Sequence, residues 1–393
     1  MRITYLFDRP LPANETDSEQ AIHTIAALSR AGAKVRLVLP SRPGTPPDAE
    51  AIRAHYCVRG DFVIEGVPQP VLGQADARKL WHAYFARARV GDDEVLYTRN
   101  FPTLFAAALS DRPFAYETYR PWFDQFRPLA PAFRAALSRP HALGAVLHSA
   151  YARDRYASIG VDPARLAVVH NGFDPELLRR APEKAEARRV LGLPGDRPIV
   201  AYTGHVNATK GIETIVGMAE RTPHALFLLV GHDGKGGLIE HLARRVPNVQ
   251  LVAWQPFDRV AYYLKAADVL LLPPSSRGLA LIGNTVLPMK IFQYLAAGRP
   301  IVAPSTPDLV ELLEDGRNAR LVAPADVDGA ARALAALLDD APLMARLARG
   351  ALDSSQDLTW DARAQKILRF LEQRLSLPHR ARSAASRDAQ SSA

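Results

Sequence analysis

A lysine and a histidine follow a short apolar stretch in the second half of the chain. Gly204 and His205 follow the apolar residues 199–202 after one intervening threonine, and Lys210 lies where the next helical stretch begins. A cation at such a strand-to-helix turn can neutralise negative charge on a phosphorylated group. Histidine is the weaker partner because its charge depends on pH. These residues are candidates for binding an anion, and a solvated lysine beside a capped turn is the structural alternative.

A second candidate lies at the start of the segment NTVLPMKIFQYLAAGRPIVAP, residues 284–304. This segment predicts a helix that ends at Gly298, where a left-handed cap is suitable, followed at once by the buried strand 301–303. Asn284 and Thr285 precede the helix, where a polar cap and free backbone N–H groups can bind an anion. The segment therefore predicts a second place where phosphate can be held.

Other patterns argue against a cofactor or a metal ion. The stretch 230–237 follows a predicted strand, and Gly231 allows close approach to a ligand, but the G-x-G-x-x-G spacing of dinucleotide sites is absent. Asp326 and Asp328 have the spacing of an Asp-x-Asp metal motif, yet they precede a predicted helix that they can cap. Cys57 is the only cysteine, which excludes an internal disulfide and a multi-cysteine metal site. We predict neither metal nor cofactor.

Polar side chains also follow two predicted strands of the first half. Arg99 follows the strand 94–98, and Glu117 and Tyr119 stand at the end of the strand 114–117. Tyr119 can donate a hydrogen bond through its hydroxyl group or stack its ring on a ligand. Glu117 and Arg99 either face a ligand or form a buried ion pair with each other.

Length and charge limit the class of protein. The 393 residues suggest two domains, and a formal net charge of +8 with a pI near 9.6 favours anionic partners. The charge is spread evenly, with 23 basic and 19 acidic residues in 1–180, and no block of like charges predicts a nucleic-acid arm. No apolar run is long enough to span a membrane, and the start MRITYLFDRP reads as a strand rather than a signal peptide. We predict a cytoplasmic protein without nucleic-acid partners.

Apolar stretches alternate with amphipathic helical stretches along most of the chain. This rhythm predicts parallel sheets covered by helices. The polar, proline-marked stretch 173–198 reads as an interdomain linker, the stretch 360–375 as a final amphipathic helix, and 376–393 as a disordered tail. The predicted strands are 3–7, 35–39, 94–98, 114–117, 145–148 and 167–170 in the first half, and 199–202, 226–230, 249–252, 269–272 and 301–303 in the second.

Several motifs occur in an order that is similar to one known family. The frame P-x-K-x-F-Q-Y-x-A-A-G-R-P-I-V-A in 284–304 resembles the donor-binding segment of family 4 glycosyltransferases, which are retaining enzymes of the GT-B fold. Further blocks resemble that family in order: HNGFD, YTGHVNATKG, LLVGHDG and NVQLVAWQPFDRVAYYLKAADVLLLP. The resemblance implies an α/β fold with two Rossmann-like, doubly wound domains facing across a cleft, at 1–180 and 197–358, with the helix 360–375 crossing back to the first.

The resemblance also implies roles for the candidate residues. On the donor side, Lys210 and His205 would neutralise the diphosphate, and Gln293 would bind the ribose. The family usually places two glutamates eight residues apart where this chain has Thr285 and Gln293, so the usual carboxylates are missing. The remaining donor-side candidates are Gly204, Gly231 and Asn284.

On the acceptor side, the resemblance implies that Glu117 and Tyr119 are catalytic residues near the transferred sugar. Tyr119 stands where relatives often have histidine, and it could donate a hydrogen bond to a sugar hydroxyl or stack on the sugar ring. Asn14, Thr16 and Arg99 would face the acceptor. Helix capping by Asp17 or Ser18 is an equal explanation for the polar stretch around Thr16.

These features predict a hexosyltransferase that moves a sugar from a nucleotide-diphosphate donor to a carbohydrate or lipid-linked acceptor. The resemblance implies that the transfer retains the anomeric configuration and needs no metal ion. Two alternatives stay open: a non-catalytic nucleotide-sugar-binding subunit, and a GT-B nucleotide-sugar epimerase or hydrolase.

The stretch 112–141 interleaves aromatic and arginine residues. Such a stretch suits either an ordinary packed helix and loop or peripheral association with the inner face of a membrane.

Overall fold

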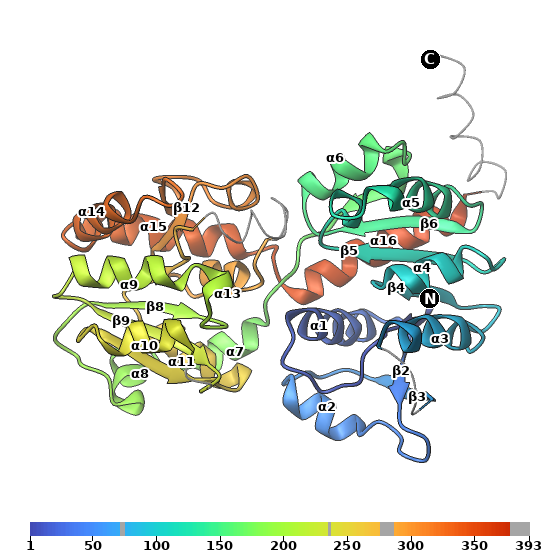
Figure 1. Cartoon of the computed structure of the whole chain (residues 1–393), viewed down its shortest axis with the longest axis horizontal. Coiled ribbons are helices and arrows are strands. Elements are labelled where there is room, and N and C mark those ends of the chain that lie inside the picture. Colours follow the sequence, from blue (N-terminus) through green and yellow to red (C-terminus); the bar gives the residue numbers. More distant parts are fainter. Residues whose placement is uncertain (71–74, 235–236, 276–286, 378–393) are drawn as a thin grey trace. The chain divides into compact units, whose positions relative to one another are not determined.

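The computed structural model describes residues 1–70, 75–234, 237–275 and 287–377. The chain divides into two compact units (Figure 1). Met1–Asn171 and Trp360–Ala393 form the first unit, and Gly172–Thr359 form the second.

The first unit contains a seven-stranded sheet in the order β3-β2-β1-β4-β5-β6-β7, in which every pairing is parallel. The order reverses between β1 and β4, and doubly wound sheets bind ligands at the carboxyl ends of the strands beside such a reversal. Every residue of β5 and of β6 is buried, as expected for parallel strands covered on both faces. The strands are β1 (Arg2–Leu6), β2 (Lys34–Ser41), β3 (Phe62–Pro68), β4 (Val95–Thr98), β5 (Phe114–Thr118), β6 (Ala142–Leu147) and β7 (Leu166–Val168).

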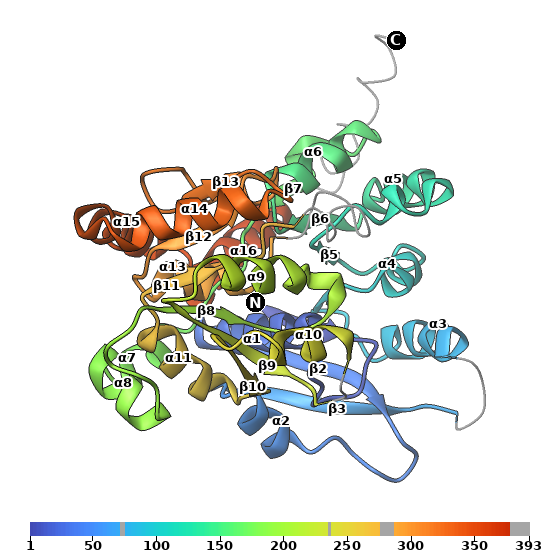
Figure 2. The same cartoon turned by 60° about the vertical axis from the view of Figure 1, so that its left-hand side comes forward.

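Helices cover both faces of this sheet. One face packs against α3, α4 and α5, and the other against α1 and the C-terminal helix α16 (Figure 2). The predicted return of the last helix to the first domain is therefore confirmed, because α16 packs along α1 and against β6. The helices of this unit are α1 (Thr16–Arg30), α2 (Ala49–His55), α3 (Ala75–Arg87), α4 (Phe101–Ala107), α5 (Ala130–Leu137), α6 (Ala150–Ser158) and α16 (Trp360–Ser376).

The second unit repeats the design with a six-stranded parallel sheet in the order β10-β9-β8-β11-β12-β13. Here the order reverses between β8 and β11. The strands are β8 (Ile199–Thr203), β9 (Leu226–His232), β10 (Val249–Ala253), β11 (Val269–Leu271), β12 (Ile301–Pro304) and β13 (Arg320–Val322).

Two apolar clusters fill the space between this second sheet and its helices. One lies under α9, α10 and α14, and the other under α7, α8, α11 and α13. The helices are α7 (Pro175–Arg180), α8 (Lys184–Leu191), α9 (Ile212–Arg221), α10 (Leu238–Arg244), α11 (Phe257–Ala266), α13 (Lys290–Ala296), α14 (Val327–Leu338) and α15 (Ala341–Ser355). The predicted class of two Rossmann-like α/β domains is confirmed.

The stretch 173–198 is not a linker. It forms α7 and α8, which pack against α11 and belong to the second unit. Two sets of contacts that hold these helices in place are not evident from the polar composition of the stretch. Leu178 and Ala187 are buried in an apolar cluster, and the half-buried carboxylate of Asp268 forms ion pairs with Lys184 and Arg188. Residues 172–180, which the sequence assigned to the first domain, therefore lie in the second unit.

The strand β3 was missed by the sequence analysis. It lies at the edge of the first sheet, and only Phe62 and Val67 among its residues are buried. A half-exposed edge strand carries Glu65 and Gly66, so its sequence lacks a continuous apolar run.

The predicted disordered tail lies almost entirely outside the described residues, since α16 reaches Ser376 and the description ends at residue 377. None of the described helices combines the length and the apolar character that a membrane-spanning segment needs.

Candidate active site

Two glycines bring the ends of β8 and β9 into direct contact. Gly204 follows β8 with φ +124° and Gly231 lies on β9 with φ +117°, values that L side chains rarely adopt. A Cβ atom on Gly231 would lie 2.6 Å from the Gly204 carbonyl oxygen. The Gly204 N–H donates to the Val230 carbonyl at 2.8 Å. The carboxyl end of the second sheet therefore presents bare backbone beside the point where the strand order reverses.

Lys290 extends its ammonium group into the same place. A Cβ atom on Gly204 would lie 2.7 Å from Lys290 Nζ, and that atom lies 3.8 Å from the centroid of the Tyr202 ring. The helix α13 that begins at Lys290 is fastened to β8, because the Thr203 N–H donates to Tyr294 Oη at 2.8 Å. Lys290 belongs to the family frame in 284–304 but was not among the site residues predicted from the sequence. Its position becomes visible only once α13 is packed on β8.

Lys210 ends the short 3-10 helix Ala208–Lys210 and supplies a second cation to this region. Its side chain is exposed to solvent, yet neighbouring protein atoms lower the pKa of its ammonium. Burial, followed by the positive charge of Lys210, lowers the pKa of Lys290 well below its usual value. Within the described residues, neither ammonium has an ion-pair partner. The two lysines form an uncompensated positive site at the carboxyl edge of the second sheet.

The other predicted donor-side residues differ in how far they are exposed to solvent. His205 is exposed, and its backbone carbonyl accepts a hydrogen bond from Tyr202 Oη at 2.9 Å. Gln293 lies half-buried on α13, one helical turn after Lys290. Asn284 and Thr285 lie outside the described residues.

In the first unit, Glu117 of β5 is the centre of a buried network. Its side chain is 0% exposed, and its Oε1 accepts from Arg363 Nη2, from Gln20 Nε2 and, at 2.9 Å, from His148 Nε2. Arg363 lies on α16 and Gln20 on α1, so the carboxylate joins both helices to the sheet. Burial by itself would raise the pKa of Glu117, but Arg363, His148 and Arg99 outweigh it and lower the pKa to about 2. Glu117 is therefore an ionised, enclosed carboxylate.

His148 takes part in this network as a neutral ring. Burial lowers its pKa to about 4, and the charge of Arg363 acts in the same direction. The Asn171 side-chain amide lies 3.3 Å from His148 Nδ1, which is the geometry of a donor to that nitrogen. The assigned tautomer therefore carries its proton on Nε2 and donates it to Glu117.

Glu117 and Arg99 do not form the buried ion pair with each other that was one of the two predicted alternatives. Glu117 pairs with Arg363, and Arg99 instead donates to Gln20 Oε1 and, at 2.8 Å, to the Asp17 carbonyl. Gln20 thus stands between the two residues, with its oxygen on Arg99 and its nitrogen on Glu117. One signal in the sequence could have indicated this, because Arg363 lies on the apolar stripe of α16 with Ile367 and Leu371.

Arg99 and Tyr119 meet at the rim of this network. The guanidinium carbon of Arg99 lies 5.6 Å from the centroid of the half-buried Tyr119 ring. Asn14 is exposed, and Thr16 is the exposed first residue of α1. Asp17 does not cap this helix but pairs with Arg9 at 3.1 Å. Among these predicted acceptor-side residues, only Arg99 and Tyr119 are brought into contact.

The Asp-x-Asp pattern has a structural explanation. Asp326 caps α14 by accepting from the Gly329 N–H at 2.8 Å, and Asp328 pairs with Arg221. The described part of the chain holds no cluster of histidine, cysteine and carboxylate side chains that could bind a metal ion.

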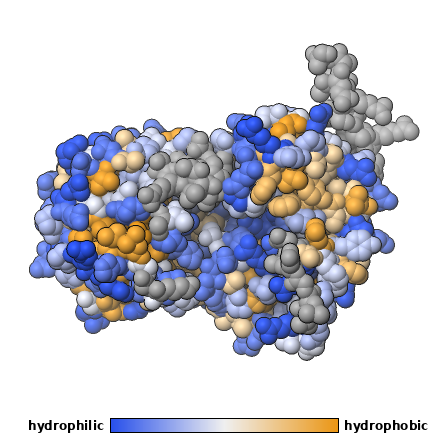
Figure 3. Space-filling model, viewed as in Figure 1, coloured by the Kyte–Doolittle hydropathy of each residue, from blue (hydrophilic) through white to orange (hydrophobic). Residues whose placement is uncertain are grey.

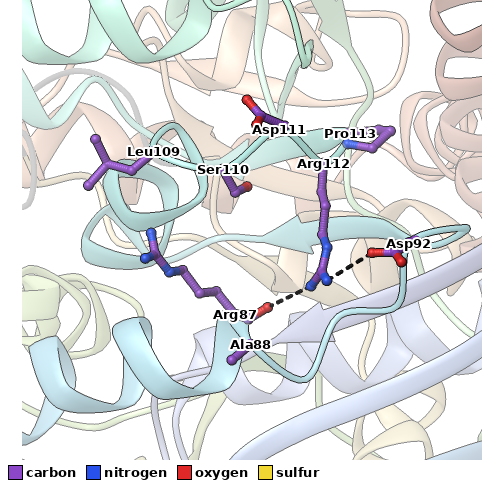
Figure 4. Close-up of a pocket in the computed structure, with 8 residues that line it drawn as sticks. All are labelled: Arg87, Ala88, Asp92, Leu109, Ser110, Asp111, Arg112 and Pro113. Carbon is purple, nitrogen blue, oxygen red and sulfur yellow. Dashed lines mark hydrogen bonds and ion pairs between the residues drawn. The ribbon is translucent and has the colours of Figure 1, made fainter.

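A surface cavity of about 450 Å³ lies at the opposite edge of the first sheet (Figure 4). Its lining comes from the turns that precede β4 and β5, so it opens at the amino ends of the strands. Arg112 lies across it, donating to Asp92 Oδ1 at 2.9 Å and directed at the Arg87 carbonyl. Because Arg112 is already paired with Asp92 and the cavity lies away from the carboxyl ends of the strands, we do not assign it to the site.

Family models match both units. One described as Glycosyltransferase Family 4 matches residues 19–177, and one described as Glycosyl transferases group 1 matches residues 197–340. The chain belongs to glycosyltransferase family 4.

Curated members of the family resemble part of the chain. The D-inositol 3-phosphate glycosyltransferase of Mycolicibacterium paratuberculosis is 31% identical over 216 residues, which are 53% of this chain and 47% of that protein. The D-inositol 3-phosphate glycosyltransferase 2 of Catenulispora acidiphila is 29% identical over 221 residues, or 52% and 50% of the two chains. The chain thus spans about half the length of the curated relatives it matches.

Solved structures resemble the whole fold. Anabaena Alr3699/HepE in complex with UDP-glucose has a TM-score of 0.70 at 18% identity, covering 95% of this chain and 100% of that one. The sucrose-phosphate synthase from Thermosynechococcus elongatus has a TM-score of 0.72 at 19% identity, covering 95% and 99%. WaaG, a glycosyltransferase involved in lipopolysaccharide biosynthesis, has a TM-score of 0.65 at 14% identity, covering 93% and 99%. This family 4 chain therefore has the GT-B fold.

Proposed function

We propose that this family 4 chain is a glycosyltransferase that transfers a sugar from a nucleoside-diphosphate donor to a carbohydrate or lipid-linked acceptor, with retention and without a metal ion. The observation that carries the proposal is the bare backbone of Gly204 and Gly231 at the strand reversal of the second sheet. Lys290 lies against Gly204, and the exposed cation Lys210 is near enough to lower the pKa of Lys290. A phosphate group can approach such a backbone closely, and the lysine can neutralise its charge.

On the donor side, Lys210 neutralises the diphosphate as the bond to the sugar breaks, with His205 as a weaker, pH-dependent partner. Gln293 accepts a hydrogen bond from the ribose through its amide oxygen. Asn284 and Thr285 complete the diphosphate site. The complex of HepE with UDP-glucose supports a donor of this chemical class.

On the acceptor side, we assign contact roles to Tyr119 and Arg99 and place Asn14 and Thr16 at the periphery. Tyr119 is half-buried and supported by Arg99, so its ring and hydroxyl can meet a sugar. Glu117 is fully buried and already accepts from three donors. We therefore assign Glu117 a positioning role instead of the catalytic role that the sequence predicted.

One observation supports a second candidate function. Gln293 stands where the family pattern has a carboxylate, which favours a non-catalytic nucleotide-sugar-binding subunit over a GT-B epimerase or hydrolase. An epimerase or hydrolase would turn over its substrate without an acceptor.

The decisive experiment incubates the full chain with a panel of nucleotide sugars and follows release of the nucleoside diphosphate with and without acceptors. We expect release that depends on an acceptor. Release without an acceptor would favour hydrolysis, and an altered sugar without release would favour epimerisation. Binding without turnover would favour the non-catalytic subunit, and absence of any nucleotide binding would overturn the whole proposal.

We further propose a cytoplasmic location with peripheral binding to the inner face of a membrane. The face of the first unit that carries α4 and α5 shows an apolar area (Figure 3). Leu109 and Phe126 are 77% and 50% exposed, and the basic Arg127 and Arg134 are exposed nearby in the sequence. Such a mixture suits an acidic lipid surface. Flotation with acidic liposomes at low salt tests this, with neutral liposomes as the control; recovery with neither would contradict it.

A further inference from the structure

Lys290 is a cation in surroundings that do not compensate its charge. Its ammonium lies over the Tyr202 ring and against the backbone of Gly204, at the inner end of α13. No described carboxylate pairs with it. A cation–π contact attracts an ammonium but leaves its charge unneutralised.

The sequence of α13 removes the nearest source of compensation. Its residues are KIFQYLA, so Lys290 is the only charged residue of the helix. Gln293 lies three positions after it, where a glutamate could pair with it along the helix surface. With a neutral amide at that position, the ammonium is available to a ligand.

Lys210 makes the arrangement unfavourable in the absence of an anion. The positive charge of Lys210 adds to burial in lowering the pKa of Lys290, as expected for like charges that lie near each other. Two neighbouring cations from different elements, one of them against bare backbone, suit a ligand with more than one negative charge. The glycines leave room for its oxygens to approach the main chain.

We infer that Lys290 is a second phosphate-binding residue, which together with Lys210 holds the diphosphate of the donor and of the released nucleoside diphosphate. This inference rests on the proposed function and adds to it a residue on α13. The ammonium of Lys290 donates to a phosphate oxygen from beneath the site, while Lys210 reaches it from the solvent side. No bond is formed or broken at Lys290, whose task is to bind and to offset charge.

The test compares Lys290→Met with the matched variant Lys265→Met. Methionine is unbranched and one heavy atom shorter than lysine, so it keeps most of the apolar part of the side chain while removing the ammonium group. Lys265 lies on α11 in the same unit and pairs with Glu183, outside the proposed site. Isothermal titration of the full chain with UDP, ADP and GDP first identifies the diphosphate that binds best to the wild type. Its affinity is then measured for both variants.

We expect Lys290→Met to weaken binding of that diphosphate by roughly 10-fold to 100-fold, the range for loss of a hydrogen bond to a charged group. Lys265→Met should bind as the wild type does. The ligand-free Lys290→Met protein should unfold at or above the wild-type temperature, which separates a lost contact from a damaged fold.

Two results would overturn the inference for different reasons. If the wild type binds a nucleoside diphosphate and Lys290→Met binds it equally well, the proposed function stands and the role of Lys290 is wrong. If the wild type binds none of the three diphosphates, the proposed function fails and the role of Lys290 fails with it.

Discussion

The two parallel sheets place charged groups at their carboxyl edges in opposite ways. In the first unit, the carboxylate of Glu117 is enclosed, and its Oε1 accepts from Arg363, Gln20 and His148. In the second unit, Lys210 and Lys290 lie near enough to interact and have no carboxylate partner among the described residues. A compensated cluster stabilises the fold, whereas an uncompensated one is stabilised by a ligand of opposite charge. Polar residues after a buried strand can therefore either stabilise the fold or bind a ligand, and only their partners in the structure distinguish these two roles.

The largest expected effect tests the enclosed cluster. Glu117→Gln should lower the free energy of unfolding by about 3–5 kcal/mol, because it leaves the buried Arg363 guanidinium without its counter-ion. Urea unfolding measures the change. Asp361→Asn is the control, since Asp361 on α16 pairs with Arg30 on α1 at the exposed surface. Loss of this exposed ion pair should lower the free energy of unfolding by less than about 1 kcal/mol. Equal losses for both variants would contradict the comparison.

The next effect tests the open cluster. Lys210→Ala should lower acceptor-dependent release of the nucleoside diphosphate by about 10²-fold to 10³-fold, because charge on the leaving group is no longer neutralised. Its stability should change by less than about 0.5 kcal/mol, since the side chain is exposed. Steady-state kinetics and thermal unfolding measure the two quantities. Unchanged kinetics would remove Lys210 from the site.

Acid should act on the first cluster in a defined window. The pKa of Glu117 is lowered from 4.5 to about 2, so its contribution to stability is present above pH 4.5 and is lost as the pH falls through about 2. The wild type should therefore lose more stability than Glu117→Gln between these values. Urea unfolding at a series of pH values checks this, and parallel curves for the two proteins would contradict it.

The smallest expected effect is an increase in the free energy of unfolding. Ligand-free Lys290→Met should be more stable than the wild type at neutral pH, by about 1 kcal/mol, because a desolvated cation is removed. The folded-state pKa of Lys290 lies below its unfolded value, so the unfolded chain binds more protons and wild-type stability rises with pH through that interval. The gap between the proteins should shrink toward pH 10.5. A variant less stable than the wild type would show that Lys290 stabilises the fold.

Much of the fold was predictable because buried parallel strands are locally apolar. β5 and β6 are buried throughout, and both were recognised. The edge strand β3 was missed because one-sided burial removes that signal. The helices α7 and α8 were read as a linker because their anchoring contacts, such as Arg188 with Asp268, join residues far apart in the chain.

For the candidate site, the sequence located the polar residues but not their partners. Residue type and position after a strand were enough to select Glu117, Arg99 and Lys210. The partner of Glu117 is separated from it by 246 positions, and no local pattern connects the two residues.

The sequence by itself determined the alternation of strands and helices, the excess of positive charge and the replacement of the family carboxylate by Gln293. These are properties of neighbouring residues or of composition. Only the tertiary structure decided that Glu117 is enclosed by α1 and α16 and that Lys290 lies against Gly204. The physical reason is that solvation and charge compensation depend on which distant segments pack together. Charged residues at a sheet edge therefore stabilise the fold where distant partners enclose them, and they stay uncompensated among the described residues where such partners are absent.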